Sequence, residues 1–528
     1  MKERALRKGV VMQNDKKSQS MLKNSAMIAV LVLFGKLLGF AKQSIQAWAF
    51  GTTAMTDTYL SADGYMSMIG QILSTSLAPV VLTSYIKVKS EKDDNRAKQF
   101  VKTCLIIFSL ISGLIIVLNA AFAKPIAKLI GVSYTSSQLD QLSQYIYMLL
   151  PIILAGSIVG VTGGYLQGKK IFWPTQLLTY FFSISIIVCI FIFKDSIGIN
   201  SVVVGFVLAY ILYSLTLIIC AKDVFRTNGL LSIRSDEIKD VIRRLLPLII
   251  STSIVDVGHL IDRVVASSLS SGSVSYLYYG QIISNDIVFS VFVIPVSTVL
   301  LPTLTEDAVS GNRIKVRNGI KSSISTLLFI LAAIAVLYIV AGHDLIELVF
   351  QRGNFDSVST DNVFRVVCGY TVGMFFMAGR EILTKGHYAY HDTFHPMLNS
   401  ILGMIINMVL SILLSKKMGS MGISLATSIS YFVVFCILLV SIQKHIGKVK
   451  LNTTLILDAV KVVIAMVISY LLGRYINSAF IEFSIIARLC VEGILILLVY
   501  IGISLILKCN TAIDLFKMIS SKFKRNTD

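Results

Sequence analysis

Charged side chains are scarce in this sequence. They make up 15% of the 528 residues, whereas 55% of the residues are hydrophobic. A soluble protein of this length needs a largely polar surface, so the composition excludes that class. The apolar residues fall in long runs, for example 327–340 with its flanks and 485–507, where only Arg488 and Glu492 are charged. Because about 20 apolar residues span the roughly 30 Å of a bilayer, the sequence predicts a membrane-embedded protein.

Acidic residues are scarcer still, with 29 Asp and Glu against 48 Lys and Arg and a net charge of +19. Such an excess can indicate nucleic-acid binding, but here the basic residues lie in short segments between apolar runs: the N-terminal tail, 87–98, 226–244, 313–321 and 517–525. If the chain starts in the cytoplasm, roughly 34 of them fall on that side and about 7 on the other, a strong positive-inside bias. We therefore expect both termini in the cytoplasm, contacts with membrane lipids and no nucleic-acid partner.

Motifs for catalysis are missing. The sequence contains no GxxxxGK[ST], GxSxG or HExxH pattern, so it predicts a protein that is not an enzyme. The seven cysteines lie far apart without CxxC spacing, which predicts neither disulfides nor a cysteine metal site. His387, His391 and His395 recur every four residues, but before Pro396 we expect a solvated turn rather than a metal site. The first apolar run has no A-x-A-like cleavage site and is expected to remain as a helix.

Apolar runs and their breaks predict an all-α integral membrane protein with fourteen transmembrane helices. Their expected ranges are 25–49, 57–86, 100–122, 142–166, 171–194, 199–221, 244–269, 275–304, 320–342, 362–385, 395–414, 420–442, 455–475 and 484–507. The basic loop divides them into two six-helix lobes and a C-terminal pair, a plan common among transporters. The expected parts are a cytoplasmic tail (1–24), an N-lobe (25–221), a linker (222–243), a C-lobe (244–442), the last helix pair (443–507) and a second cytoplasmic tail (508–528).

Ionisable residues inside the predicted helices mark candidate functional positions, because each costs about 2.5–3.5 kcal/mol at mid-helix. They include Lys36, Lys42, Asp57, Asp63, Asp256, His259, Asp262, Arg263, Asp286, Arg380 and Glu381. Asp256, His259 and Arg263 share one stripe of a helix, and Asp256 and His259 are expected to pair. We predict a water-filled cavity in which cations meet an anionic head group. For Lys42 and Asp57, nearer the helix ends, internal pairing or an interfacial position stays open.

Several segments resemble motifs of one known family. VFQRGNFD at 349–356 resembles its VFQRGxF, and REILT at 380–384 with YAYHDT at 388–393 resembles REILT…FYALxDTxTP. SGSVS at 271–275, with YY at 278–279, resembles SGSVSxxYYA, and LP at 301–302 with SGN at 310–312 resembles LLPxLSxxxASGN. GISLATSIS at 422–430 resembles GLALATSIS, and GFAK at 39–42 with FG at 50–51 and TD at 56–57 resembles RVLGFxRD…FGAGxxTDAF.

The family with these motifs is that of the MurJ/MviN-type lipid II flippases. The resemblance implies the fold of the MOP exporter superfamily, with a central cavity and a groove for a lipid tail at the last helix pair. It implies a monomeric flippase that moves undecaprenyl-diphosphate-linked peptidoglycan precursor (lipid II) to the outer leaflet of the bacterial cytoplasmic membrane by alternating access. The candidate substrate-binding residues are Lys36, Lys42, Asp57, His259 and Arg263. The resemblance also implies a possible Na⁺ site, the one cofactor expected, at Asp262, Asn407, Ser411, Ile423 (through its carbonyl) and Thr427.

The sequence departs from the family pattern at several charges. Lysines stand at Lys36 and Lys42, where the family usually has arginines, so bidentate phosphate binding is lost. Gln43 replaces an acidic residue, the family's Arg and Glu of the second helix have no counterpart, and 280–281 is Gly-Gln instead of Asp-Arg. Two alternatives therefore stay open: a flippase for another undecaprenyl-linked glycan, such as a capsule or teichoic precursor, or an inactive membrane scaffold of the same fold.

Overall fold

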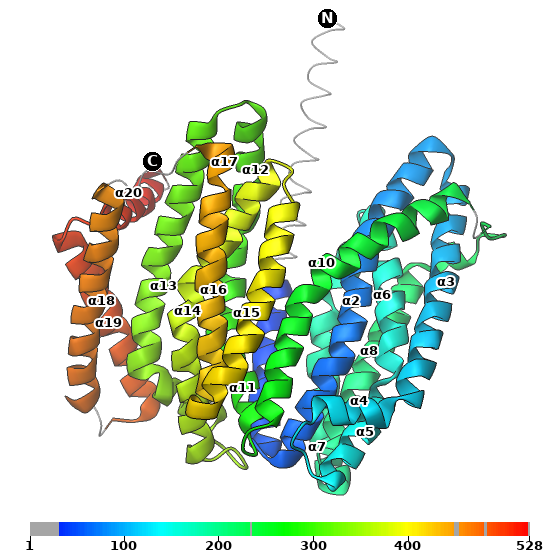
Figure 1. The fold of residues 1–528 in the computed structure, drawn as a ribbon, viewed down its shortest axis with the longest axis horizontal. Helices are drawn as coiled ribbons and strands as arrows, with labels where there is room; N and C mark the ends of the chain where they lie inside the picture. The colour runs from blue at the N-terminus through cyan, green and yellow to red at the C-terminus, as the bar shows by residue number, and fades with distance from the viewer. Residues whose placement is uncertain (1–30, 233–234, 448–452, 480–482, 526–528) are drawn as a thin grey trace, which may run out of the picture. The chain divides into compact units, whose positions relative to one another are not determined.

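The computed structural model describes residues 31–232, 235–447, 453–479 and 483–525, which form helices joined by turns and contain no β-strand (Figure 1). Thirteen helices within these ranges are long and apolar enough to cross a bilayer. Residues 31–50 form a further helix, so the structure is consistent with fourteen membrane helices. The tail predicted for 1–24 and the start of the first predicted helix lie outside the described residues.

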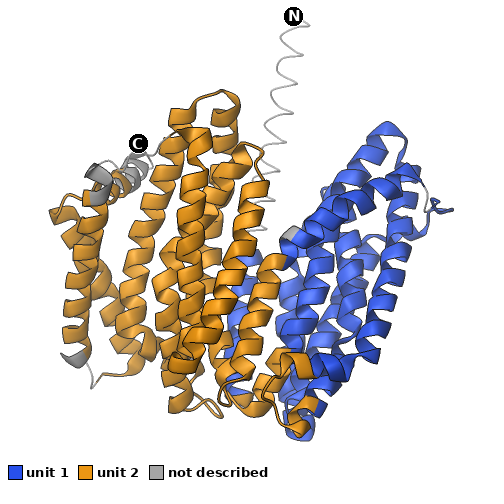
Figure 2. Cartoon of the chain, in the orientation of Figure 1, with its two compact units in different colours: residues 1–49, 62–127, 140–253 blue, residues 50–61, 128–139, 254–528 orange. Residues whose placement is uncertain are grey.

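Two compact units divide the chain (Figure 2). Unit 1 comprises residues 1–49, 62–127 and 140–253, and unit 2 comprises 50–61, 128–139 and 254–528. The helices α2 (Ala54–Glu91) and α10 (Asp236–Ser267) therefore each contribute residues to both units. The lobe boundaries expected from the basic loop stay a prediction.

Between α2 and α10, the described residues form several long helices and a few short ones. After α2 come α3 (Asp94–Ala121), α4 (Ala123–Ile130), α5 (Ser136–Leu149), α6 (Pro151–Gly168), the 3₁₀ turn η1 (Trp173–Gln176), α7 (Leu178–Ile197), α8 (Asn200–Cys220) and α9 (Lys222–Phe225). The fifth predicted helix starts later than expected, because the chain around Pro174 forms η1 instead of continuing as an α-helix. A proline removes a backbone donor and restricts the residue before it.

Small residues set the packing of α6 in unit 1. Gly156, Gly160 and Gly164 repeat every four residues on one face, and a Cβ on any of them would collide with α2 between Gly70 and Ala78. The hydrophobic effect does not drive helices together inside a lipid bilayer. Membrane helices associate instead through close packing, which small residues allow because they let two backbones approach each other. The glycine stripe therefore specifies the α2–α6 contact.

The second half of the chain builds unit 2. Its helices are α11 (Ser273–Gln281), α12 (Ile294–Val309), α13 (Arg313–Phe350), α14 (Ser357–Ala389), α15 (Phe394–Met418), α16 (Ser420–Ser441), α17 (Gln443–Ile446), α18 (Thr453–Ala479), α19 (Ile485–Ile506) and α20 (Asn510–Arg525). Two π-helical turns, η2 (Ile282–Asp286) and η3 (Phe289–Val293), join α11 to α12 within one membrane span. α20 is a helix within the segment that the sequence predicted as a tail.

Candidate functional site

The helix over residues 31–50 presents the two candidate lysines of unit 1. It packs against α7, where the Tyr180 hydroxyl donates to the Leu31 carbonyl at 2.7 Å. Lys36 is exposed, whereas Lys42 is half-buried. The Asp63 carboxylate interacts electrostatically with Lys42, so Lys42 has an acidic neighbour within its own unit.

Asp57 is a buried cap in unit 2. Its Oδ2 accepts a hydrogen bond from the Gly272 N–H at 2.6 Å, and its Oδ1 accepts from the N–H and the hydroxyl of Ser275, at 2.8 and 2.6 Å. Because Gly272 is the N-cap position of α11, the carboxylate satisfies donors at a helix N-terminus, where negative charge is favoured. The substrate role predicted for Asp57 stays a prediction, while both of its oxygens have protein partners.

The ionisable residues predicted to share one stripe of α10 have different surroundings in the structure. His259 lines a pocket of unit 2, but the Arg263 guanidinium donates to the Leu60 carbonyl at 2.7 Å and lies 5.7 Å from the centre of the Tyr278 ring. Within the described structure no hydrogen bond or ion pair joins Asp256 to His259, so the expected pairing is absent. Sequence spacing placed these residues on one face correctly but did not identify their partners.

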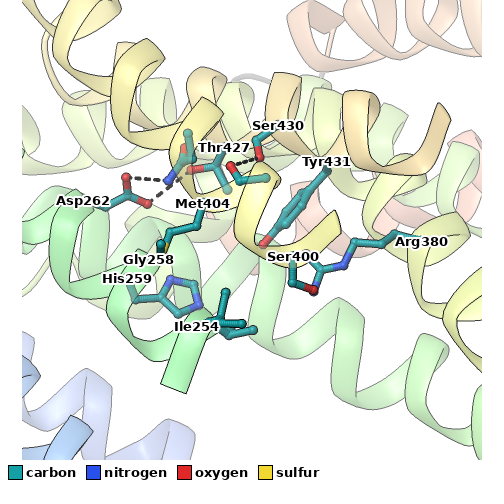
Figure 3. A pocket seen from close by; sticks show the side chains of 13 residues that line it. Ile254, Gly258, His259, Asp262, Arg380, Ser400, Met404, Thr427, Ser430 and Tyr431 are labelled. Carbon is teal, nitrogen blue, oxygen red and sulfur yellow. Dashed lines mark hydrogen bonds between the residues drawn. The ribbon is translucent and has the colours of Figure 1, made fainter. Parts of the chain in front are cut away.

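The pocket lies between α10, α14, α15 and α16 of unit 2 and has a volume of about 60 Å³ (Figure 3). Its lining includes His259, Asp262, Arg380, Ser400 and Tyr431. A water needs roughly 10–15 Å³ of such volume, so the pocket accepts an ion with a few waters and is too small for a glycan head group.

Arg380 also lines the pocket; the sequence marked it as a charge inside a helix but did not place it among the candidate binding residues. Its guanidinium lies 5.4 Å from the centre of the Tyr431 ring, in cation–π range. The signal was present in the sequence, because an arginine in an apolar helix is costly unless it faces a cavity or a partner.

Three of the five residues that the resemblance implied for Na⁺, Asp262, Asn407 and Thr427, line this pocket. The Asp262 carboxylate receives the Asn407 amide N–H at 2.9 Å and the Ser411 hydroxyl at 3.0 Å on Oδ1, and the Thr427 hydroxyl at 3.3 Å on Oδ2. The Thr427 hydroxyl also lies 3.1 Å from the Ile423 carbonyl. The structure thus brings together all five residues from α10, α15 and α16.

The oxygens of this cluster outnumber its donors. The Ser411 hydroxyl lies within reach of both Asp262 Oδ1 and the amide oxygen of Asn407, at 3.0 and 3.4 Å, and the Thr427 hydroxyl is likewise shared between two acceptors. Each hydroxyl has one proton. One carboxylate with neutral hydroxyl, amide and carbonyl oxygens fits a hard monovalent cation.

A larger, mainly apolar cavity of about 830 Å³ lies elsewhere in unit 2. Its walls come from α13, α16 and α18, with side chains such as Leu328, Phe435 and Val462. Arg317 and Lys321 of α13 and Asp458 of α18 also line it. The cavity combines an apolar wall with cations, as a site for an anionic lipid requires.

Comparison with known proteins identifies close similarity to one family. The family model described as "Lipid II flippase MurJ" matches residues 46–490. A probable lipid II flippase of Borreliella burgdorferi is 25% identical over 435 residues, covering 81% of this chain and 84% of the relative. A probable lipid II flippase of Buchnera aphidicola is 23% identical, covering 87% of this chain and 93% of the relative.

Solved structures agree on the fold. A lipid II flippase MurJ in an inward closed conformation matches with a TM-score of 0.78 at 21% identity and covers 93% of this chain and 100% of the other. A multidrug resistance MATE family transporter of the MOP superfamily matches with a TM-score of 0.65 at 14% identity, over 79% of this chain and 98% of the other. These two solved structures therefore share the fold of this chain.

Proposed function

The chain belongs to the lipid II flippase MurJ family, and on that premise we propose that it carries lipid II from the inner to the outer leaflet of the bacterial cytoplasmic membrane by alternating access. The family consists of transport proteins rather than catalytic enzymes. The observation that carries the proposal is the family match over most of the chain, in a protein whose described helices include thirteen candidate membrane spans.

The apolar cavity of unit 2 supports a lipid-linked substrate. A polyprenyl chain has its lowest free energy when its apolar surface contacts apolar side chains or lipid rather than water. The wall formed by α13, α16 and α18 offers such side chains, and Arg317 and Lys321 supply charge for a phosphate. We propose that the groove expected at the last helix pair includes this cavity, because α18 forms part of its wall.

Lys36 is proposed to attract the diphosphate in unit 1. It is an exposed cation within an apolar helix, and such a residue is costly unless it serves a substrate or a partner. A lysine contacts phosphate as a point charge, so we expect charge at this position to matter more than side-chain shape.

The Asp262 cluster is proposed to bind Na⁺ as a coupling ion. Asp262 would supply the charge, and Asn407, Ser411, Thr427 and the Ile423 carbonyl would supply neutral oxygens. All of these oxygens lie in unit 2, so ion binding would order α10 against α15 and α16 without any contribution from unit 1.

Replacement of the chromosomal flippase tests the function. In a bacterium depleted of its own lipid II flippase, the wild-type chain is expected to restore growth, Lys36→Arg to do the same, and Lys36→Ala to fail at equal membrane levels. Failure of the wild-type chain, despite correct insertion, would favour another undecaprenyl-linked glycan or an inactive scaffold. Growth with Lys36→Ala would reject only the proposed role of Lys36 and would leave the proposed flippase function in place.

Reporter fusions test the proposed orientation, in which both termini are cytoplasmic. Fusions at Thr227 and Asn312 should report the cytoplasm, and fusions at Ser137 and Ser357 the outside. The reason is the excess of basic residues in the segments around the first pair. A cytoplasmic signal at Ser357 would overturn the topology of the second half.

A further inference from the structure

Three histidines surround one carboxylate at the end of α14 in unit 2. The Asp392 Oδ2 atom lies 2.8 Å from His387 Nδ1, 2.8 Å from His395 Nδ1 and 3.2 Å from His445 Nε2. His387 belongs to the last turn of α14, Asp392 to the following turn, His395 to the first turn of α15 and His445 to α17. The cluster therefore joins three elements, and the solvated turn expected from the sequence is wrong for His387, whose side chain is fully buried.

Hydrogen bonding alone does not account for this arrangement. A carboxylate oxygen offers about two lone-pair directions, yet three imidazole nitrogens face Asp392 Oδ2. The other oxygen, Oδ1, is already used by the backbone N–H of His395 at 3.2 Å. The buried Nδ1 atom of His395 makes no hydrogen bond of acceptable geometry although it lies 2.8 Å from Oδ2.

The second nitrogen of His387 also has a protein partner. Its Nε2 lies 2.9 Å from the Ser441 hydroxyl, and that hydroxyl lies 3.1 Å from the Leu438 carbonyl. In the tautomer with the proton on Nε2, Ser441 Oγ accepts that proton, and the lone pair of Nδ1 is directed at Asp392 Oδ2 and can bind a metal ion.

We propose that His387 Nδ1, His395 Nδ1 and Asp392 Oδ2 bind one divalent transition-metal ion of the Zn²⁺ class. Two imidazoles and a carboxylate, with water in the fourth position, form a ligand set that suits Zn²⁺. The three ligand atoms lie within 4.8 Å of one another, and Oδ2 is 2.8 Å from each of the two nitrogens. Ligand atoms about 2.0 Å from a tetrahedral ion lie about 3.3 Å from one another.

Neighbouring contacts hold the ligands in place. The Ser441 hydroxyl orients His387 as an outer partner orients a metal-binding imidazole, and the Tyr390 ring stacks on His445 with ring centres 4.8 Å apart. The His445 Nε2 atom lies 3.2 Å from Asp392 Oδ2 as a hydrogen-bond partner of the carboxylate. An ion bound here ties the end of α14 to the start of α15.

Metal binding by the purified full-length chain tests the proposal. The chain, carrying an affinity tag without histidines, is stripped with chelator and titrated with Zn²⁺ against a fluorescent chelator. We expect one Zn²⁺ per chain, a melting temperature that rises with Zn²⁺, and visible absorption typical of four-coordinate Co²⁺ when Co²⁺ is used as the probe.

Matched variants identify the ligands. His387 is fully buried and its loss could prevent folding, so the first variant is His395→Gln, at a histidine whose side chain is 34% exposed. It should weaken Zn²⁺ binding at least tenfold and reduce the rise in melting temperature. His445→Gln, which removes a partner of Asp392 but no ligand, should weaken binding less. The control His391→Asn changes the exposed histidine of the same turn, at φ 58°, a conformation that asparagine tolerates.

The outcomes are distinct from those of the flippase test, since metal binding needs no substrate. Zn²⁺ affinity unchanged in His395→Gln, an equal loss in His391→Asn, or no Zn²⁺ binding by the stripped wild-type chain would each overturn the proposal.

Discussion

Asp57 and Asp262 are both buried carboxylates in unit 2, but their partners differ in kind. Asp57 receives two backbone N–H groups and one hydroxyl at the start of α11. Asp262 receives only side-chain groups, an amide and two hydroxyls. Backbone N–H groups are fixed donors, whereas hydroxyls and amides turn their oxygens toward a cation by rotating. The first carboxylate therefore suits a permanent cap, and the second suits an exchangeable ion.

The largest effect is expected from Asp57→Ala. Loss of three short hydrogen bonds to a carboxylate leaves donors at the α11 N-terminus without their cap, which should cost about 3 kcal/mol of stability. Thermal unfolding of the purified protein measures this loss. Ser275→Ala, which removes one hydroxyl and leaves both backbone bonds, should cost less. An unchanged melting temperature together with weaker lipid II binding would instead support the substrate role predicted from the sequence.

Arg263→Gln should have a smaller effect. The guanidinium donates to the Leu60 carbonyl, three residues from the capping Asp57, and packs on Tyr278. We expect a loss of about 1.5 kcal/mol of stability, typical of a hydrogen bond to a charged group, with unchanged affinity for lipid II. Lipid II binding and melting temperature are measured on the same preparation. A tenfold or larger loss of lipid II affinity at constant stability would support the substrate-binding role that the sequence predicted for Arg263.

The smallest effect is expected from Asp262→Asn, and it should depend on the salt. When K⁺ is replaced by Na⁺, at a Na⁺ concentration ten times the dissociation constant of Na⁺, the wild-type chain should gain about 1.4 kcal/mol of stability. Asp262→Asn should remove this sodium response, because the remaining oxygens carry no charge. Asp256→Asn, on the same helix but outside the cluster, is the control and should keep the response. A sodium-induced rise in melting temperature that persists in Asp262→Asn would exclude the carboxylate as a ligand.

Much of the fold could be predicted from local sequence. Apolar runs located the membrane helices, because hydropathy over about 20 residues decides insertion. The boundaries were less accurate where packing or proline intervenes: α13 extends from Arg313 to Phe350, well beyond the expected 320–342, and a helix covers Asn510–Arg525 where a tail was expected. A charged helix end and an amphipathic surface helix are both too polar for a search based on apolar runs.

The candidate site was predictable only in part. The family motifs pointed to the Asp262 cluster, and the cost of charge in hydrocarbon marked Asp57, Arg263 and Arg380 as meaningful. Neither signal specifies a partner. Arg380 faces the pocket with His259, while Arg263, on the same stripe as His259, contacts Leu60 and Tyr278. A side chain's direction depends on the helices packed around it, and one helix's periodicity does not contain that information.

The sequence by itself determined that this chain is a membrane protein, where its helices lie and which of them carry charge, because these properties depend on short windows of residues. Only the tertiary structure decided what the charges do. Asp57 meets Gly272 and Ser275 across more than 200 residues, and Asp392 meets His445 across 53. Such contacts form because helix packing brings distant segments together, and a buried polar group takes whichever partner that packing supplies.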